Sequence, residues 1–234
     1  MEPRRQVDEK RRRRALKAFD RFAARASRKL EARYGKEFAD ETLGHARVEL
    51  ERLLPEIPYI GGLRNAFTPV MIVNGWGIAL YRAMAARGKT AADTIRICAA
   101  VSDEFVGSAP AIILKSFGRL AFSPYLRRYF KKQAARSQER RYKEDFVYEV
   151  QEGADGEMSL IFSECAVNKF YTAQGVEELK PYCNFFDVTY SRLMGMGCDA
   201  SETIGLGCDR CALRYKHGRA TEVPPALKGI LPRS

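Results

Sequence analysis

The first 142 residues place their apolar side chains three and four positions apart, which is the spacing of amphipathic helices. Over residues 10–34 this stripe consists of Leu16, Phe19, Ala23, Ala26 and Leu30. A second stripe runs from Leu43 to Leu54 and stops at Pro55. Because each stripe leaves one apolar face, we expect both helices to pack against later parts of the chain.

Three more helical patterns follow before residue 144. A helix is expected over residues 68–87, with Thr68 as its N-cap and a proline at its first position. A capping-box variant opens the next helix, over residues 90–105. Residues 109–142 predict further helix with a break at the Ser-Pro pair 123–124.

The pattern changes near residue 144, where apolar and polar positions begin to alternate. Residues 145–151 and 157–165 flank a Gly-Ala-Asp-Gly turn and predict a β-hairpin. The later elements expected are helices at 167–172 and 181–194 and strands at 198–204 and 211–217. The order β-β-α-α-β-β predicts an α+β fold in which an N-terminal helical layer packs on a small antiparallel sheet.

The length and composition allow this arrangement to form one domain. The chain has 234 residues, 46% of them hydrophobic, which is enough for a sizeable core. The expected segments are 1–55 (basic N-terminal helices), 56–143 (helical part of the core), 144–218 (cysteine-bearing α+β part of the same domain) and 219–234 (tail).

The net charge of +11 is concentrated in one stretch. Residues 115–143 hold ten Lys and Arg against one acid, Glu139. Such a stretch is typical of a solvated helix face, and peripheral membrane contact is the alternative that we keep open. No nucleic-acid-binding motif accompanies it, so we do not expect a nucleic acid partner.

The six cysteines point to free thiols in a reducing compartment. The N-terminal stretch is charged and lacks the apolar region of a secretory signal, so a cytoplasmic location is expected. Cys98 lies among apolar helix positions and is expected to be a buried core thiol. The other five fall within the last seventy residues, which makes this part the candidate site.

Cys208 and Cys211 have the spacing of half a zinc site. A structural zinc site pairs two such motifs, and only one is present. If both residues lay on one strand, their odd separation would place them on opposite faces. We therefore expect no cofactor, with zinc bound by Cys208 and Cys211 as the alternative. His217 lies too far along the strand to form a local pair with Cys211.

Cys183 and Asp187 are four residues apart in a predicted helix, so they are expected to share a face. A carboxylate beside a thiol raises the pKa of the thiol, but it can act as a general base or hold a substrate amine. The alternative interpretation places Cys183 in the core and Asp187 on the surface.

Several stretches resemble the L-2-amino-thiazoline-4-carboxylic acid hydrolase family. They are residues 163–165 (SEC), 169–183, Asp187 within FFDVTY, and 203–218, with 57–62 and 136–150 upstream. The resemblance covers most of the chain from about residue 55. A more distant resemblance links the β-β-α-α-β-β part to four-vinyl-reductase-type and haem-NO-binding-type ligand domains.

The resemblance implies a hydrolase that opens a small cyclic, sulfur-containing amidine with water. A cysteine thiolate would attack the amidine carbon, with Cys183 as the first candidate and Cys211 as the second. Asp187 would serve as base or anchor. The substrate-contacting positions that the resemblance suggests are Cys165, Tyr171 and Thr203.

Two departures from the family pattern keep a second function class open. Ala212 and Leu213 stand where the family has Asp-Phe, and Ala200 stands where an arginine is expected. If that arginine holds a substrate carboxylate, this chain binds a different substrate or has lost the activity. The alternative function is a small-molecule or zinc-binding module of the same fold, without catalysis.

Overall fold

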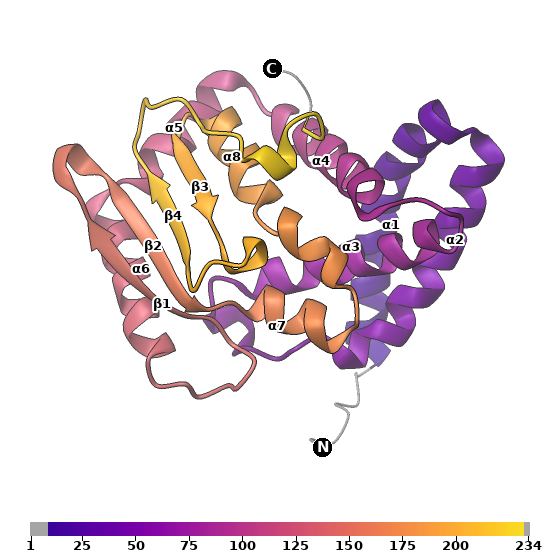
Figure 1. Cartoon of the computed structure of the whole chain (residues 1–234), viewed down its shortest axis with the longest axis horizontal. Coiled ribbons are helices and arrows are strands. Elements are labelled where there is room, and N and C mark those ends of the chain that lie inside the picture. Colours follow the sequence, from indigo (N-terminus) through magenta and orange to yellow (C-terminus); the bar gives the residue numbers. More distant parts are fainter. Residues whose placement is uncertain (1–8, 232–234) are drawn as a thin grey trace.

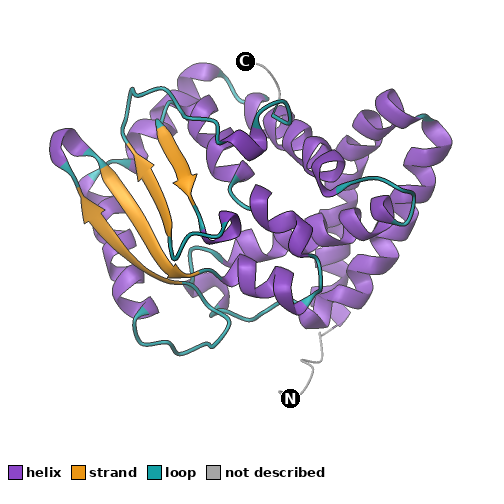
Figure 2. Ribbon diagram, viewed as in Figure 1, coloured by secondary structure: helices purple, strands orange, loops and turns teal. Residues whose placement is uncertain are grey.

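The computed structural model describes residues 9–231, and residues 1–8 and 232–234 of the N-terminal and tail segments lie outside the described part. Its helical layer consists of α1 (Glu9–Tyr34), α2 (Lys36–Leu53), α3 (Thr68–Ala85), α4 (Ala91–Gly107), α5 (Ala111–Ala121) and α6 (Pro124–Ser137). The second part contains β1 (Val147–Glu152), β2 (Met158–Glu164), α7 (Ala166–Ala173), α8 (Phe185–Met194), β3 (Cys198–Glu202) and β4 (Cys211–Tyr215). Figure 2 shows the sheet at one end of a mostly helical molecule.

The helical layer follows the apolar stripes of the sequence. The stripes of α1 and α2 are buried against each other, and α2 packs on α3 (Figure 1). The chain turns between α1 and α2 at Gly35, whose φ of 90° is readily adopted by glycine. The capping box of α4 is confirmed, since Thr90 and Asp93 exchange side-chain to backbone hydrogen bonds.

The expected N-cap role of Thr68 is wrong. Phe67 occupies the N-cap position, and Thr68 is the first residue of α3. The Thr68 hydroxyl donates a hydrogen bond to the carbonyl oxygen of Gly62 at 2.6 Å, so it braces the preceding loop instead. This loop carries Phe67 toward the sheet, where its ring packs on Phe146 and Phe162.

The α+β class and the antiparallel sheet are confirmed, but the expected strand order is not matched by the sheet. The strands lie in the order β1-β2-β4-β3, so β4 and not β3 is the neighbour of β2. All pairs are antiparallel, and Cys211 on β4 lies opposite Phe162 on β2. The connection through α7 and α8 carries the chain past β2, so β3 forms the edge and β4 fills the gap.

The helix expected over residues 181–194 begins later than its pattern indicates. Residues Glu177–Tyr182 form a 3-10 helix, and α8 starts only at Phe185. Pro181 lacks a backbone N–H and cannot continue an α-helix across this point. Cys183 therefore precedes α8, although Asp187 lies in its first turn.

The core is continuous across the expected segments. One cluster of buried apolar residues extends from Leu16 on α1 to Leu231 near the end of the described chain. The tail takes part in it, because Leu227, Ile230 and Leu231 are buried. Cys98 is buried in this core as expected. Among residues 9–231, no single helix has the length and apolar character needed to cross a membrane.

Candidate active site

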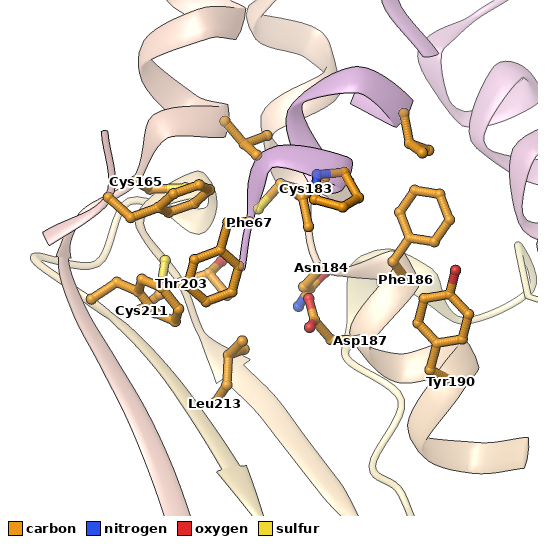
Figure 3. Close-up of a pocket in the computed structure, with 16 residues that line it drawn as sticks. Phe67, Cys165, Cys183, Asn184, Phe186, Asp187, Tyr190, Thr203, Cys211 and Leu213 are labelled. Carbon is orange, nitrogen blue, oxygen red and sulfur yellow. The ribbon is translucent and has the colours of Figure 1, made fainter. Parts of the chain in front are cut away.

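A cavity of about 290 Å³ lies between the start of α3, the start of α8 and the sheet (Figure 3). Its wall is mainly aromatic and aliphatic. Its few polar side chains come from α8 and the residues just before it, from the residues that follow β2 and β3, and from the first residue of β4. The lining residues are Phe67, Pro69, Val70, Val73, Phe146, Phe162, Cys165, Val167, Cys183, Asn184, Phe186, Asp187, Tyr190, Thr203, Cys211 and Leu213. Apolar walls with a few convergent polar groups are typical of small-molecule sites.

Five of the seven residues named from the sequence meet in this cavity. They are Cys165, Cys183, Asp187, Thr203 and Cys211. Tyr171 lies elsewhere: its hydroxyl donates a hydrogen bond to Asn74, and its ring lines an adjoining cavity of about 520 Å³. Cys208 is half-exposed in the turn before β4 and does not line the cavity.

Cys165 sits where β2 ends and α7 begins, at the N-cap position of that helix. The Asn168 side chain donates a hydrogen bond from Nδ2 to the Cys165 sulfur at 3.3 Å. The Cys211 thiol is a hydrogen-bond partner that stabilises the Cys165 thiolate, as do the backbone N–H groups of Val167 and Asn168. Together these donors, led by the Cys211 thiol, lower the pKa of Cys165 despite its burial.

The other two thiols of the cavity keep their protons. The pKa of Cys211 is raised because its proton is shared with the Cys165 sulfur, and burial adds to the shift. Burial raises the pKa of Cys183, and the neighbouring Cys165 thiolate raises it further. Cys165, expected only to contact substrate, is therefore the thiol of the cavity whose pKa is lowered, whereas burial raises the pKa of Cys183, the first candidate for the nucleophile.

Asp187 is the one carboxyl side chain among the residues that line the cavity, and none of them is Lys or Arg. Burial raises the pKa of Asp187 to about 6. The Tyr215 hydroxyl donates a hydrogen bond to Oδ1 at 3.2 Å, which partly offsets this rise. A carboxyl group with this pKa holds and releases protons near neutral pH. In Figure 3, Asp187 and Asn184 lie across the cavity from the sulfur of Cys211.

Two buried polar atoms of the lining residues have no hydrogen-bond partner among residues 9–231. They are the Thr203 hydroxyl oxygen and the Asn184 side-chain oxygen. The Asn184 amide nitrogen is occupied, because it donates to the carbonyl oxygen of Ala200 at 2.7 Å. Buried polar atoms are normally hydrogen-bonded, so both atoms can serve as contacts for a bound molecule.

Among residues 9–231, Cys208 and Cys211 are joined by no further side chains that would complete a zinc site. Within residues 9–231, no group of three or more His, Cys, Asp or Glu side chains could hold a metal ion. The Cys211 sulfur instead accepts a hydrogen bond from the backbone N–H of Ile204 at 3.2 Å. His217 packs edge-on against Phe122, away from the thiols.

Three residues that shape the site are not among those that the sequence pattern indicated. Asn168 positions the Cys165 sulfur, Asn184 presents a free oxygen, and Tyr215 contacts Asp187. Asn168 could have been found, because it follows Cys165 by three residues at a predicted strand-to-helix junction. Nothing in the spacing of Tyr215 relates it to Asp187.

A family model described as L-2-amino-thiazoline-4-carboxylic acid hydrolase matches residues 70–215. No curated protein and no solved structure matches the chain. The matched segment is more than half of the 234 residues and includes every thiol and carboxyl group that lines the cavity. The chain belongs to the L-2-amino-thiazoline-4-carboxylic acid hydrolase family.

Proposed function

We propose that this protein opens a small cyclic amidine by hydrolysis, with Cys165 as the nucleophile. One observation carries the proposal: Cys165 is the thiol of the cavity whose pKa is lowered, and it is held by Cys211 and Asn168. A thiolate, unlike a thiol, attacks an electron-poor carbon. The family name, which describes a hydrolase of a thiazoline ring, supports the same chemistry.

The reaction begins when the Cys165 thiolate adds to the carbon of the amidinium group. The ring carbon–sulfur bond breaks, and the departing sulfur takes a proton that Asp187 has received from the amidinium nitrogen. Water then adds to the same carbon, and the bond between carbon and the Cys165 sulfur breaks. Overall, one amidinium ion and one water give one ring-opened carbamoyl product and one proton.

The charge of the cavity suggests which ring is bound. No Lys or Arg is among the lining residues, and Ala200 stands where the family resemblance predicts an arginine. A substrate carboxylate would have no cationic partner there and would face Asp187. An amidinium ion would pair with Asp187 and donate to the free oxygen of Asn184. We therefore propose a cationic ring that lacks the carboxylate of the family's namesake substrate.

Two substrates and two variants test this function. Purified protein is assayed with 2-amino-2-thiazoline and with its 4-carboxylate, and product formation is followed by mass spectrometry. We expect turnover of the first compound, with a kcat/KM at least about tenfold higher than for the carboxylate, since an unpaired buried charge costs several kcal/mol. Cys165→Ala lowers kcat by on the order of 10⁴-fold, while the matched control Cys208→Ala, outside the cavity, keeps it.

Different results would contradict the proposed substrate, the thiolate mechanism and catalysis itself. Preference for the carboxylate would overturn the proposed substrate but leave the ring-opening reaction in place. Full turnover by Cys165→Ala would overturn the thiolate mechanism. Saturable binding of both compounds without turnover would identify the chain as a ligand-binding module of this fold.

A further inference from the structure

Helix α5 exposes an apolar face to solvent. Its exposed apolar residues, with their exposed fractions, are Ile112 (76%), Ile113 (45%), Phe117 (57%) and Leu120 (51%). At 100° per residue these four positions fall within about 140° of arc, so they form one continuous stripe. Large apolar side chains of this kind gathered on one surface mark an interaction site.

The stripe is distinct from the face that holds α5 on the protein. Leu114 and Gly118 are buried and point about half a turn away from the stripe. Gly118 lies so close to the Met194 carbonyl group at the end of α8 that a side chain there would clash. The inward face therefore accounts for the attachment of α5, and the outward stripe has no partner in the described residues.

Helix α6 follows α5 after two intervening residues and carries exposed aromatic and basic residues of its own. Tyr125 and Tyr129 are exposed by 78% and 36%. Arg128 and Lys132 are exposed as well, and the four positions share one helix face at spacings of three and four residues. Tyrosines beside lysines and arginines are typical of segments at a membrane–water interface.

The positive charge beside the stripe is not neutralised within the described chain. Arg127 and Lys131 pair with Glu152, but Lys115, Arg119, Arg128 and Lys132 form no ion pair among residues 9–231. Between residues 115 and 143 there are ten basic residues and one acidic residue. A partner for this surface must offer both negative charge and an apolar layer.

We propose that the α5–α6 face, made of the exposed residues 112–132 named above, docks on an anionic lipid bilayer. A helix that lies in the interface plane buries its apolar stripe among the acyl chains and places its basic side chains at the headgroups. A second copy of this chain fits less well, because two such faces would bring their excess positive charges together. A nucleic acid would leave the apolar stripe uncovered.

Vesicle co-sedimentation of the full chain tests this proposal. Vesicles of phosphatidylcholine alone are compared with vesicles that contain 30% phosphatidylserine, at low and high salt. We expect binding to the anionic vesicles at low salt, weaker binding at high salt and little binding to the neutral ones. Equal binding to both vesicle types, or no binding at low salt, would overturn the proposal.

Matched variants separate the two components of the surface. Ile112→Gln with Phe117→Gln lowers the partition coefficient at least about tenfold, while Leu63→Gln, at an exposed apolar site elsewhere, does not. Lys115→Gln with Arg119→Gln lowers the partition coefficient about thirtyfold. The equal charge change Lys17→Gln with Lys36→Gln lowers it less.

Circular dichroism verifies that each variant is folded. We expect all of them to fold, because the replaced side chains are exposed. Light scattering of the wild type at assay concentration reports any self-association. A dimer that Phe117→Gln dissociates, without vesicle binding by the wild type, would assign the face to a second copy instead. Duplex DNA binding that is unaffected by the loss of Ile112 and Phe117, again without vesicle binding, would also overturn the proposal.

Discussion

The Cys211 thiol is expected to set the reactivity of Cys165, and replacing Cys211 tests this directly. Cys211 lies on β4 and its thiol is the leading cause of the lowered pKa of Cys165. Cys211→Ala removes the donor, whereas Cys211→Ser keeps a hydroxyl donor of similar size at the same place. The pair therefore separates loss of the hydrogen bond from loss of the sulfur atom.

The expected magnitude follows from the energy of one such bond. A hydrogen bond to a charged group contributes roughly 1.5–3 kcal/mol, and the lower figure suits a weakly donating thiol. Since one pKa unit corresponds to about 1.4 kcal/mol, Cys211→Ala raises the pKa of Cys165 by about one unit. At a pH below both pKa values, the thiolate population then falls about tenfold.

Alkylation by iodoacetamide measures this change. The protein is treated at intervals between pH 5 and 9, and the modified peptide that contains Cys165 is quantified by mass spectrometry. We expect the midpoint of the rate profile to rise by about one pH unit in Cys211→Ala and by less in Cys211→Ser. An unchanged midpoint in Cys211→Ala, or faster alkylation of Cys183 than of Cys165 in the wild type, would refute this account of the site.

Two further predictions concern stability. Because burial raises the folded-state pKa of Asp187 to about 6, its neutral form is favoured and wild-type stability falls as pH rises through that value. Asp187→Asn should thus have a larger free energy of unfolding in urea than the wild type at pH 8, by on the order of 3 kcal/mol, and the difference should vanish below about pH 4. Equal stability at pH 8 would show that the carboxyl group is well solvated. Gly118→Ala should destabilise the fold by about 2–3 kcal/mol, because the added Cβ meets the Met194 carbonyl oxygen. The control Gly107→Ala, whose added Cβ meets nothing within 4 Å, should change the free energy of unfolding in urea by less than about 1 kcal/mol. Equal urea midpoints for these two variants would contradict the packing of α5 on α8.

Periodicity predicted the helices well because a helix that packs on one side repeats its apolar residues at a fixed spacing. The stripes of α1 and α2 and the capping box of α4 are local features, and the structure confirms them. The start of α8 was predicted too early, since the apolar pattern continues through a 3-10 segment that contains Pro181. Pattern alone does not distinguish the two helix types at such a boundary.

The sequence by itself determined the fold class, the family resemblance and the set of thiols from which a site can be made. The spacing put Cys183 first among those thiols, whereas in the structure it is the pKa of Cys165 that is lowered, because a thiol's pKa depends on donors that are remote along the chain. Only the tertiary structure places β4 beside β2, and this strand order brings Cys211 to Cys165 across 46 residues of sequence. The same packing leaves Tyr171 and Cys208 outside the cavity. Strand pairing and burial act between distant segments, so no local spacing encodes which thiol lies beside which hydrogen-bond donor.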